Sequence, residues 1–122
     1  MKASKKTLVI GASDNPSRYS FLAINKLRQH QHEVVAIGKK KATVAGVNIT
    51  TEMEPVADID TVTLYINPQL QTAYYNYILS LKPRRIIFNP GTENNELQEL
   101  AAGKGIQTLE ACTLVMLSTN QY

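Results

Sequence analysis

Short apolar runs rich in β-branched residues alternate with longer amphipathic stretches along this chain, and this alternation constrains its fold most strongly. Runs such as TLVI at residues 7–10 and TVTLYI at residues 61–66 predict buried strands. Between residues 70 and 81, apolar side chains recur at steps of three and four, which predicts a helix. Strands separated by helices pair in parallel, because each helix returns the chain to the opposite end of the sheet.

The alternation predicts a Rossmann-like, doubly wound α/β fold, a three-layer sandwich with a mainly parallel sheet. We expect about five strands, over residues 7–10, 33–37, 61–66, 85–88 and 106–110. We expect helices over residues 20–31 and 68–81, around 97–101, and over 113–118. The segment 44–51 around Gly46 is extended but ambiguous. No repeat or Pro/Gly-rich linker divides the 122 residues, so we expect a single domain over 1–122.

Composition and charge narrow the class of protein. Hydrophobic residues make up 43% and charged residues 19%, as in an ordinary globular domain. No apolar run approaches the roughly 20 residues that span a membrane, and the run after the basic start at 1–6 is too short for a signal peptide. The single cysteine, Cys112, forms no internal disulfide, so we expect a cytoplasmic protein. The net charge of +3, partly in two lysine clusters, fits a small polyanion better than nucleic acid.

A doubly wound sheet binds its ligand beyond the carboxyl ends of the strands. The segment after the first strand is therefore a candidate phosphate loop, since it also opens a helix whose N-terminus attracts anions. Its backbone N–H groups at Gly11 and Ala12 can face a phosphate, Ser13 and Asn15 add side-chain donors, and Arg18 can pair with phosphate oxygens. The alternative is an ordinary Asp-Asn-Pro-Ser turn.

The end of the second strand distinguishes between nucleotides. Lys39, Lys40 and Lys41 stand where an NAD-binding domain has an acidic residue for the ribose. The first loop also lacks the further glycines of a dinucleotide fingerprint. Both features favour a nucleotide with an extra phosphate on its ribose, such as coenzyme A or NADP. Solvated surface lysines are the alternative.

The ends of the next two strands offer groups for an adenosine. An aromatic, an aliphatic, an amide and a ring could cover one face of the base and bond its edge; these are Tyr65, Ile66, Asn67 and Pro68. The tight turn at Asn89 and Pro90 lies beside them. The alternative is that Tyr65 belongs to the core and that Asn67 only caps the helix that Pro68 begins.

No set of residues predicts catalysis or a metal site. His30 and His32 lie at the end of the first predicted helix, on the side of the sheet away from the ligand, where positive charge suits the helix C-terminus. Cys112 has no base beside it in the sequence, and we interpret it as a small buried residue. The alternative is a thiol that exchanges with the thiol of CoA. We therefore expect no catalytic residue and no metal ligand.

The chain resembles the small stand-alone CoA-binding domain proteins, which are similar to the N-terminal CoA-binding domain of the succinyl-CoA synthetase α subunit. The resemblance covers about residues 5–122 and rests on GASDNPSRYS at 11–20, HEVVAIG at 32–38, IDTVTLYINP at 59–68, IIFNPGTEN at 86–94 and EACTLVML at 110–117. It implies that the loops after the first two strands hold the phosphates and that the middle strand ends hold the adenosine. The chain has Ile37-Gly38-Lys39 where such proteins often have Asn-Pro, so the lysine that meets phosphate stays open.

The resemblance implies a protein that binds coenzyme A or an acyl-CoA without catalysis of its own. Two alternatives stay open: a CoA-binding subunit of an acyl-CoA ligase, and a regulatory module that binds NADP or another nucleotide. The expected partner is the small-molecule cofactor. We expect no binding to nucleic acid or membrane, and we leave open a protein partner or a homo-oligomer.

Overall fold

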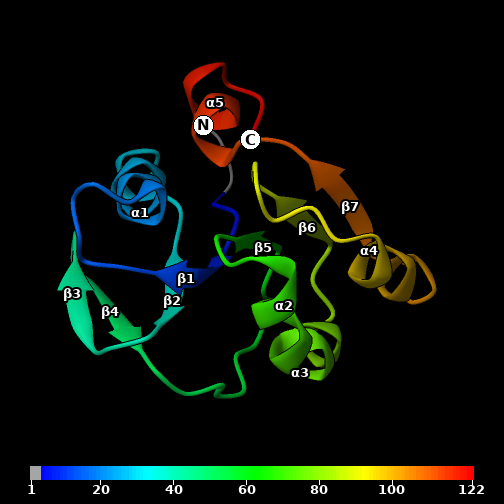
Figure 1. Cartoon of the computed structure of the whole chain (residues 1–122). Coiled ribbons are helices and arrows are strands. Elements are labelled where there is room, and N and C mark those ends of the chain that lie inside the picture. Colours follow the sequence, from blue (N-terminus) through cyan, green and yellow to red (C-terminus); the bar gives the residue numbers. More distant parts are fainter. Residues whose placement is uncertain (1–3) are drawn as a thin grey trace.

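Seven strands form one sheet in the computed structural model, which describes residues 4–122 (Figure 1). Their order across the sheet is β3-β4-β2-β1-β5-β6-β7. The strands are β1 (Thr7–Ala12), β2 (Val34–Gly38), β3 (Ala42–Val44), β4 (Val47–Thr50), β5 (Thr61–Leu64), β6 (Arg85–Phe88) and β7 (Gln107–Glu110). All neighbours pair in parallel except β3 and β4. The first three residues of the basic segment 1–6 lie outside the described residues.

The predicted fold class is confirmed, but the strand count of about five is wrong. The ambiguous segment around Gly46 is a β-hairpin that supplies β3 and β4. Ala45 and Gly46 form its two-residue turn, with φ angles of 51° and 78°. Two positive φ angles are the geometry that matches the twist of a tight hairpin, and they usually select Asn-Gly or Asp-Gly. Ala-Gly is a weak signal for this turn.

Helices cover both faces of the sheet (Figure 1). One face carries α1 (Tyr19–Gln29) and α5 (Thr113–Ser118), and the other carries α2 (Pro68–Gln71), η1 (Thr72–Tyr74), α3 (Tyr75–Leu81) and α4 (Asn95–Ala102). The helix predicted over 68–81 is thus divided into three short pieces. Lys82, with a φ of 51°, ends the last of them. In the part of the chain that is described, no helix is long and apolar enough to cross a bilayer.

The central strand shows why a continuous apolar run was needed. Leu8 and Ile10 of β1 join the core beneath α3 and α4, whereas Val9 joins the core beneath α1. All three side chains are fully buried. A strand covered on both faces has no polar face, as is usual in a parallel sheet.

The order of the strands reverses direction at β1. From β1 the chain passes to β2 and the hairpin on one side, and then crosses to β5, β6 and β7 on the other. The switch point therefore lies between β1 and β5, whose carboxyl ends are neighbours. In doubly wound sheets this crevice is where ligands bind.

Candidate functional site

The end of β1 lies directly against the segment that follows β5. Gly11 has a φ of 92°, and a Cβ added there would lie 2.8 Å from Ile66 Cγ2 and 2.9 Å from the carbonyl carbon of Tyr65. Any side chain at Gly11 would push the two strand ends apart. The glycine is therefore required both by backbone conformation and by space.

The loop after β1 is held in shape by the side chains that we predicted as ligand donors. Ser13 Oγ accepts a hydrogen bond from the N–H of Asn15 at 3.0 Å. Asn15 Oδ1 accepts from the N–H of Ser17 at 3.0 Å and from its hydroxyl at 2.8 Å. Arg18 precedes α1, and its side chain is exposed. Within residues 4–122 the Arg18 guanidinium has no ion-pair partner, so it is available to an anion.

One of the three lysines after β2 reaches this loop. Lys40 Nζ lies 3.4 Å from Asp14 Oδ1, while Lys39 and Lys41 are exposed without an ion pair to any described residue. The approach is close because Gly38 ends β2: a Cβ there would lie 2.3 Å from the carbonyl oxygen of Ala12. The structure thus brings the two predicted phosphate-binding segments together and points to Lys40 as the lysine beside the first loop.

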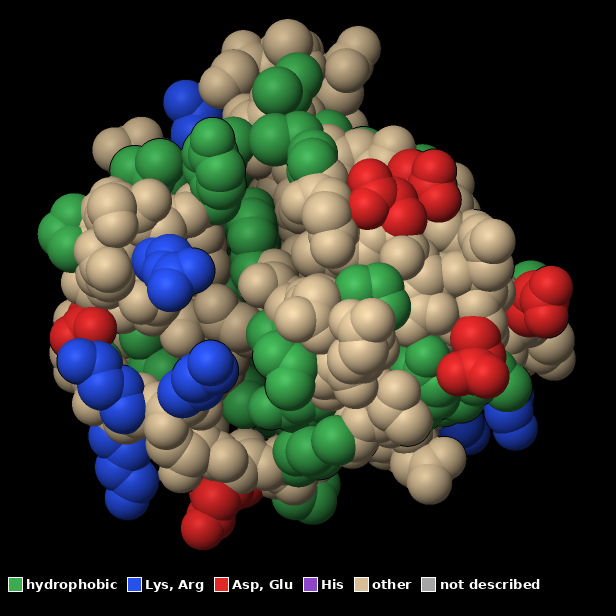
Figure 2. Space-filling model, in the orientation of Figure 1, with side chains coloured by type: hydrophobic (Ala, Val, Ile, Leu, Met, Phe, Trp, Pro, Cys, Tyr) green, Lys and Arg blue, Asp and Glu red, His purple; other side chains and the backbone are tan. Residues whose placement is uncertain are grey.

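Charge is distributed unevenly over this face of the molecule. Figure 2 shows most of its Lys and Arg side chains over α1, β3 and β4, and most of its Asp and Glu side chains on the opposite side, toward α4 and β7. A hollow lined with hydrophobic side chains runs between the two regions. The basic side coincides with the loops after β1 and β2.

Tyr65, predicted to cover the adenine, lies on the inner side of the strand end. Its ring packs against the core beneath α1, and its hydroxyl lies by those of Thr63 and Thr113. Burial raises the pKa of Tyr65 well above the usual value, so the hydroxyl stays protonated. Ile66 packs on the opposite face of the sheet. The Tyr65 ring is thus partly buried, with its hydroxyl directed into the interior and not toward the open edge.

Asn67 caps the helix that follows, as the sequence predicts. Its Oδ1 accepts a hydrogen bond from the N–H of Leu70 at 3.0 Å, and Pro68 occupies the first turn of α2. Asn67 is exposed, and its amide nitrogen makes no hydrogen bond to another described residue. Capping uses only the oxygen, which leaves the N–H groups for a ligand.

Asn89 joins three elements instead of facing the edge. It is buried, and its Nδ2 donates to Thr63 Oγ1 at 2.7 Å and to the Leu64 carbonyl at 2.9 Å. Its Oδ1 accepts from the N–H of Thr113 at 2.8 Å. Both amide hydrogens are used within the protein, so Asn89 holds β5, β6 and α5 in place. Pro90 is exposed in the turn that follows.

A second buried amide, which sequence reasoning missed, ties the same loops together. Gln71 is fully buried, and its Nε2 donates to the carbonyl oxygens of Ile66 at 2.9 Å and Thr92 at 2.7 Å. Asn94 adds a hydrogen bond from its Nδ2 to Gln71 Oε1 at 2.9 Å. Asn94 also caps α4, a position that an Asn before an amphipathic stretch signals. Gln71 had no such signal, because glutamine in a helix is usually exposed.

The histidines lie away from these loops. His30 is the C-cap of α1, and His32 follows it in a buried position. His32 Nδ1 accepts a hydrogen bond from the N–H of Lys5 at 2.9 Å, and its ring is 5.0 Å from that of Tyr122. Within the described residues, no group of three or more His, Cys, Asp or Glu side chains could hold a metal ion. Cys112 is partly buried just before α5.

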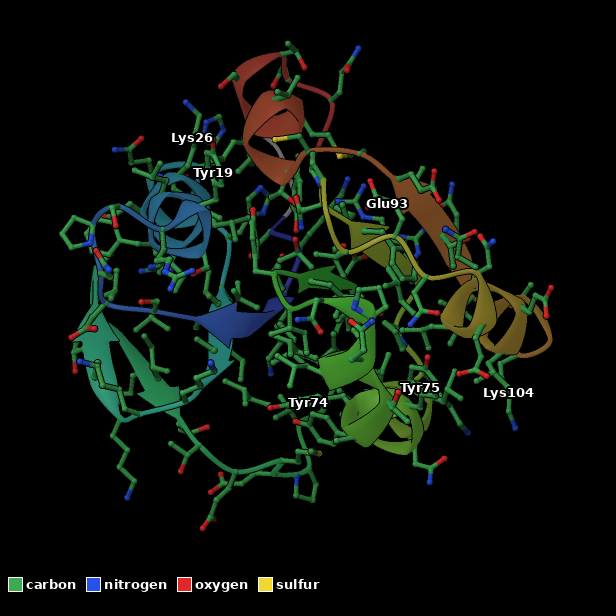
Figure 3. The ribbon with its side chains drawn as sticks, in the orientation of Figure 1. Tyr19, Lys26, Tyr74, Tyr75, Glu93 and Lys104 are labelled. Carbon is green, nitrogen blue, oxygen red and sulfur yellow. The ribbon has the colours of Figure 1, made fainter. Side chains whose placement is uncertain are left out.

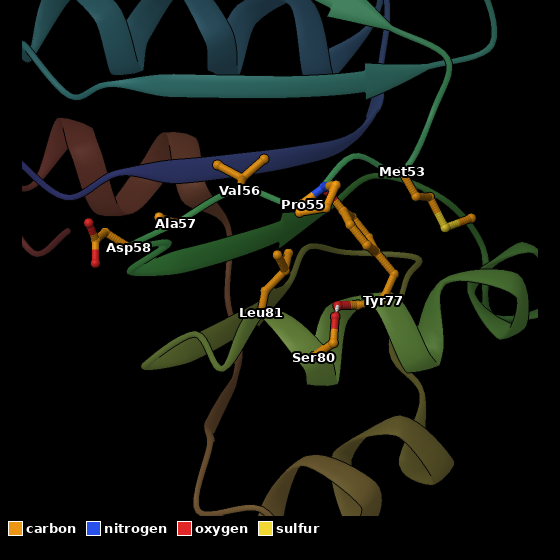
Figure 4. A pocket seen from close by; sticks show the side chains of 8 residues that line it. All are labelled: Met53, Pro55, Val56, Ala57, Asp58, Tyr77, Ser80 and Leu81. Atoms are coloured by element: carbon orange, nitrogen blue, oxygen red, sulfur yellow. Dashed lines mark hydrogen bonds between the residues drawn. The ribbon is translucent and has the colours of Figure 1, made fainter.

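A pocket elsewhere on the molecule contains none of the predicted site residues. It lies between α3 and the irregular crossover that joins β4 to β5 (Figure 4). Met53, Val56, Tyr77 and Leu81 are among its lining residues. The Tyr77 hydroxyl donates a 2.6 Å hydrogen bond to the Glu54 carbonyl and so ties the crossover to α3. We assign the candidate site to the carboxyl edge, because the switch point and the basic loops lie there.

The parallel sheet, its switch point and the polar loops at its carboxyl edge define a Rossmann-like domain with a candidate ligand site at that edge. The chain belongs to the CoA binding domain family, whose model matches residues 5–118.

Solved structures of similar proteins support this family and fold. One, of an uncharacterized protein, is 52% identical with a TM-score of 0.96, and the match covers 99% of this chain and 100% of that one. A hypothetical protein from Pyrococcus horikoshii OT3 is 23% identical with a TM-score of 0.85, over 95% of this chain and 83% of its own. A Thermus thermophilus protein is 19% identical with a TM-score of 0.82, over 98% and 91%. The last two show the fold alone. The search of curated proteins gave no match.

Proposed function

We propose that this protein binds coenzyme A, free or acylated, at the carboxyl edge of the sheet and catalyses no reaction by itself. The observation that carries the proposal is the contact between the loops after β1 and β2, which lie on one side of the switch point. Gly38 allows β2 to end against Ala12, and Lys40 reaches Asp14 in the loop after β1. A ligand with phosphates at two separate places can bind both loops at once.

The chemistry of the loops suggests which phosphate each one takes. The pyrophosphate lies at the start of α1, an eleven-residue helix whose N-terminal N–H groups attract an anion, with Arg18 beside it. The ribose 3′-phosphate lies by the lysines after β2. Lysines attract this phosphate, whereas the carboxylate of an NAD-binding domain would repel it.

A comparison of nucleotides tests the proposal. We expect CoA to raise the melting temperature most, 3′-dephospho-CoA less and NAD least, because only CoA places a phosphate at the lysines. Ligand at 100 times its Kd adds about 2.7 kcal/mol to the free energy of unfolding. A larger shift with NAD than with CoA at equal concentration would refute the assignment.

The lysines also favour a second candidate, a module that binds NADP, whose ribose carries an extra phosphate too. NADP is therefore included in the same comparison, and a shift larger with NADP than with CoA would favour it.

The absence of catalysis, which is also part of the proposal, is tested by a separate assay. Purified protein mixed with a panel of acyl-CoAs should release thiol at the background rate. Turnover that disappears in Cys112→Ser would contradict this expectation.

A further inference from the structure

A chain of hydrogen bonds runs from the interior to the surface between α2, α3 and α4. Its inner end is Gln71, and its second member, Asn94, donates to Gln71 Oε1 within the buried interior. Asn94 Nδ2 also donates to the hydroxyl oxygen of Tyr75 at 2.8 Å, in a bond that is only partly buried. The Tyr75 hydroxyl therefore ends the chain at the surface.

The direction of every hydrogen bond in this chain is determined. The Gln71 amide nitrogen lies between two backbone carbonyl oxygens, so its own oxygen must face Asn94. Asn94 then presents its nitrogen, while its oxygen accepts from the N–H of Leu97 at 3.2 Å. The second N–H of Asn94 is thus given to Tyr75, whose oxygen is an acceptor. The Tyr75 proton must point away from Asn94, and among residues 4–122 it has no acceptor.

Tyr75 lies beside the part of the carboxyl edge formed by β5 and β6. It is the first residue of α3, and Figure 3 shows it on the side of that helix toward α4. Its partner Asn94 ends the loop that follows β6. A hydroxyl held by Asn94, which Gln71 holds in turn, needs little reorganisation to bind an acceptor.

We propose that the Tyr75 hydroxyl is a specificity-determining donor of this site, and that it binds an amide carbonyl oxygen in the pantetheine arm of CoA. The inference rests on the proposed function. There the phosphates lie against the loops after β1 and β2, which lets the arm extend over the ends of β5 and β6. The pantetheine amides are neutral acceptors, which suit a neutral hydroxyl on the less basic side of the face.

The test uses Tyr75→Phe and two ligands, CoA and adenosine 3′,5′-bisphosphate, which lacks the arm. Calorimetry should show CoA affinity lower by about 3- to 10-fold, the effect of one neutral hydrogen bond, and unchanged affinity for the bisphosphate. Tyr77→Phe is the matched control, because it also removes one hydroxyl bond, to the Glu54 carbonyl, where α3 faces the crossover between β4 and β5. It should leave both affinities unchanged.

The outcomes separate this inference from a purely structural role and from the proposed function. Equal losses for both ligands would show that Tyr75 only supports the loops, and no loss for CoA would show that it faces solvent; either overturns the inference. A parent protein that binds no CoA would overturn the proposed function and this inference together.

A measurement on the unmodified chain covers the case in which Tyr75→Phe does not fold. In protein with isotope-labelled tyrosine, CoA should shift the NMR signal of the Tyr75 ring, and the bisphosphate should leave it in place. Equal shifts with both ligands would overturn the inference.

Discussion

At the scale of single residues, two glycines with the same backbone angle differ in what surrounds them. Gly11 and Gly91 both have a φ of 92°. A Cβ at Gly11 would meet the Tyr65 backbone at 2.9 Å, whereas one at Gly91 would meet nothing within 4 Å. The pair therefore separates the cost of the backbone angle from the cost of contact between strand ends.

We expect Gly91→Ala to lower the free energy of unfolding by about 1–2 kcal/mol, the cost of a positive φ for a residue with a Cβ. Gly11→Ala should lower it further, by about another 1–3 kcal/mol, because it also overpacks the switch point. It should weaken CoA binding as well, since the loop after β1 must shift. Denaturant unfolding and calorimetry of both variants check this. Equal destabilisation would mean that the strand ends can move apart freely.

The same scale shows how far single residues could be assigned from the sequence. The cap role of Asn67 follows from an Asn-Pro pair after a strand, and the structure confirms it. The inward direction of Tyr65 depends on which face of the sheet the strand end presents, and this is set by pairing with β1. The sequence alone therefore could not decide whether Tyr65 packs in the core or contacts the ligand.

At the scale of elements, the sequence predicts the strands and helices that have a periodic apolar pattern. It does not predict features that depend on contacts between residues far apart in the chain. The parallel strands follow from apolar runs, and α1 follows from its periodicity. The hairpin of β3 and β4 is missed because its turn uses Ala45 and not a typical turn residue. Gln71 is missed because its role comes from Thr92, more than a dozen residues away, and no local pattern encodes that distance.

Folding stability should depend on pH through His32, which lies between α1 and β2 and packs against Tyr122. The pKa of His32 is lowered, first by burial and then by the nearby positive charges of His30, Lys5 and Arg85, which outweigh Asp60. Neutral His32 also accepts the Lys5 N–H through Nδ1, a bond that protonation breaks.

Folding stability should therefore fall as the pH drops below 6.5. The unfolded chain takes up a proton at the ordinary pKa of about 6.5, while the folded protein resists until its lower pKa is reached. The stabilisation is therefore complete above pH 6.5 and is lost as the pH falls from about 6.5 to the lower pKa of the folded protein. Urea unfolding between pH 7.5 and 5.5 measures the slope. His32→Gln, which keeps an acceptor, should flatten the slope, and His30→Gln should reduce it only in part, because burial is the larger cause of the lowered pKa. An unchanged slope in His32→Gln would place the titrating group elsewhere.

At the scale of the whole molecule, the uneven charge of the carboxyl-edge face gives the protein a polarity that its small net charge conceals. The formal charge is only +3, yet cations gather at the loops after β1 and β2 while most acidic side chains of that face lie on the other side. An anionic ligand is attracted to one side of the hollow and repelled by the other. This should orient the phosphates of CoA toward β1 and β2.

Salt should therefore weaken CoA binding, because it screens the attraction between the CoA phosphates and the cations at the loops after β1 and β2. Raising NaCl from 0.05 to 0.5 M shortens the screening length from about 14 to 4 Å, so the affinity should fall. In Lys40→Met, which removes the cation beside the first loop, the affinity should be lower at low salt and should depend less on salt. Lys104→Met removes an exposed cation beyond the end of α4, toward the acidic side (Figure 3), and should leave both quantities unchanged. Calorimetry at the two salt concentrations measures the slopes. The same slope for Lys40→Met as for the parent would move the phosphates away from Lys40, toward Arg18 or the other two lysines.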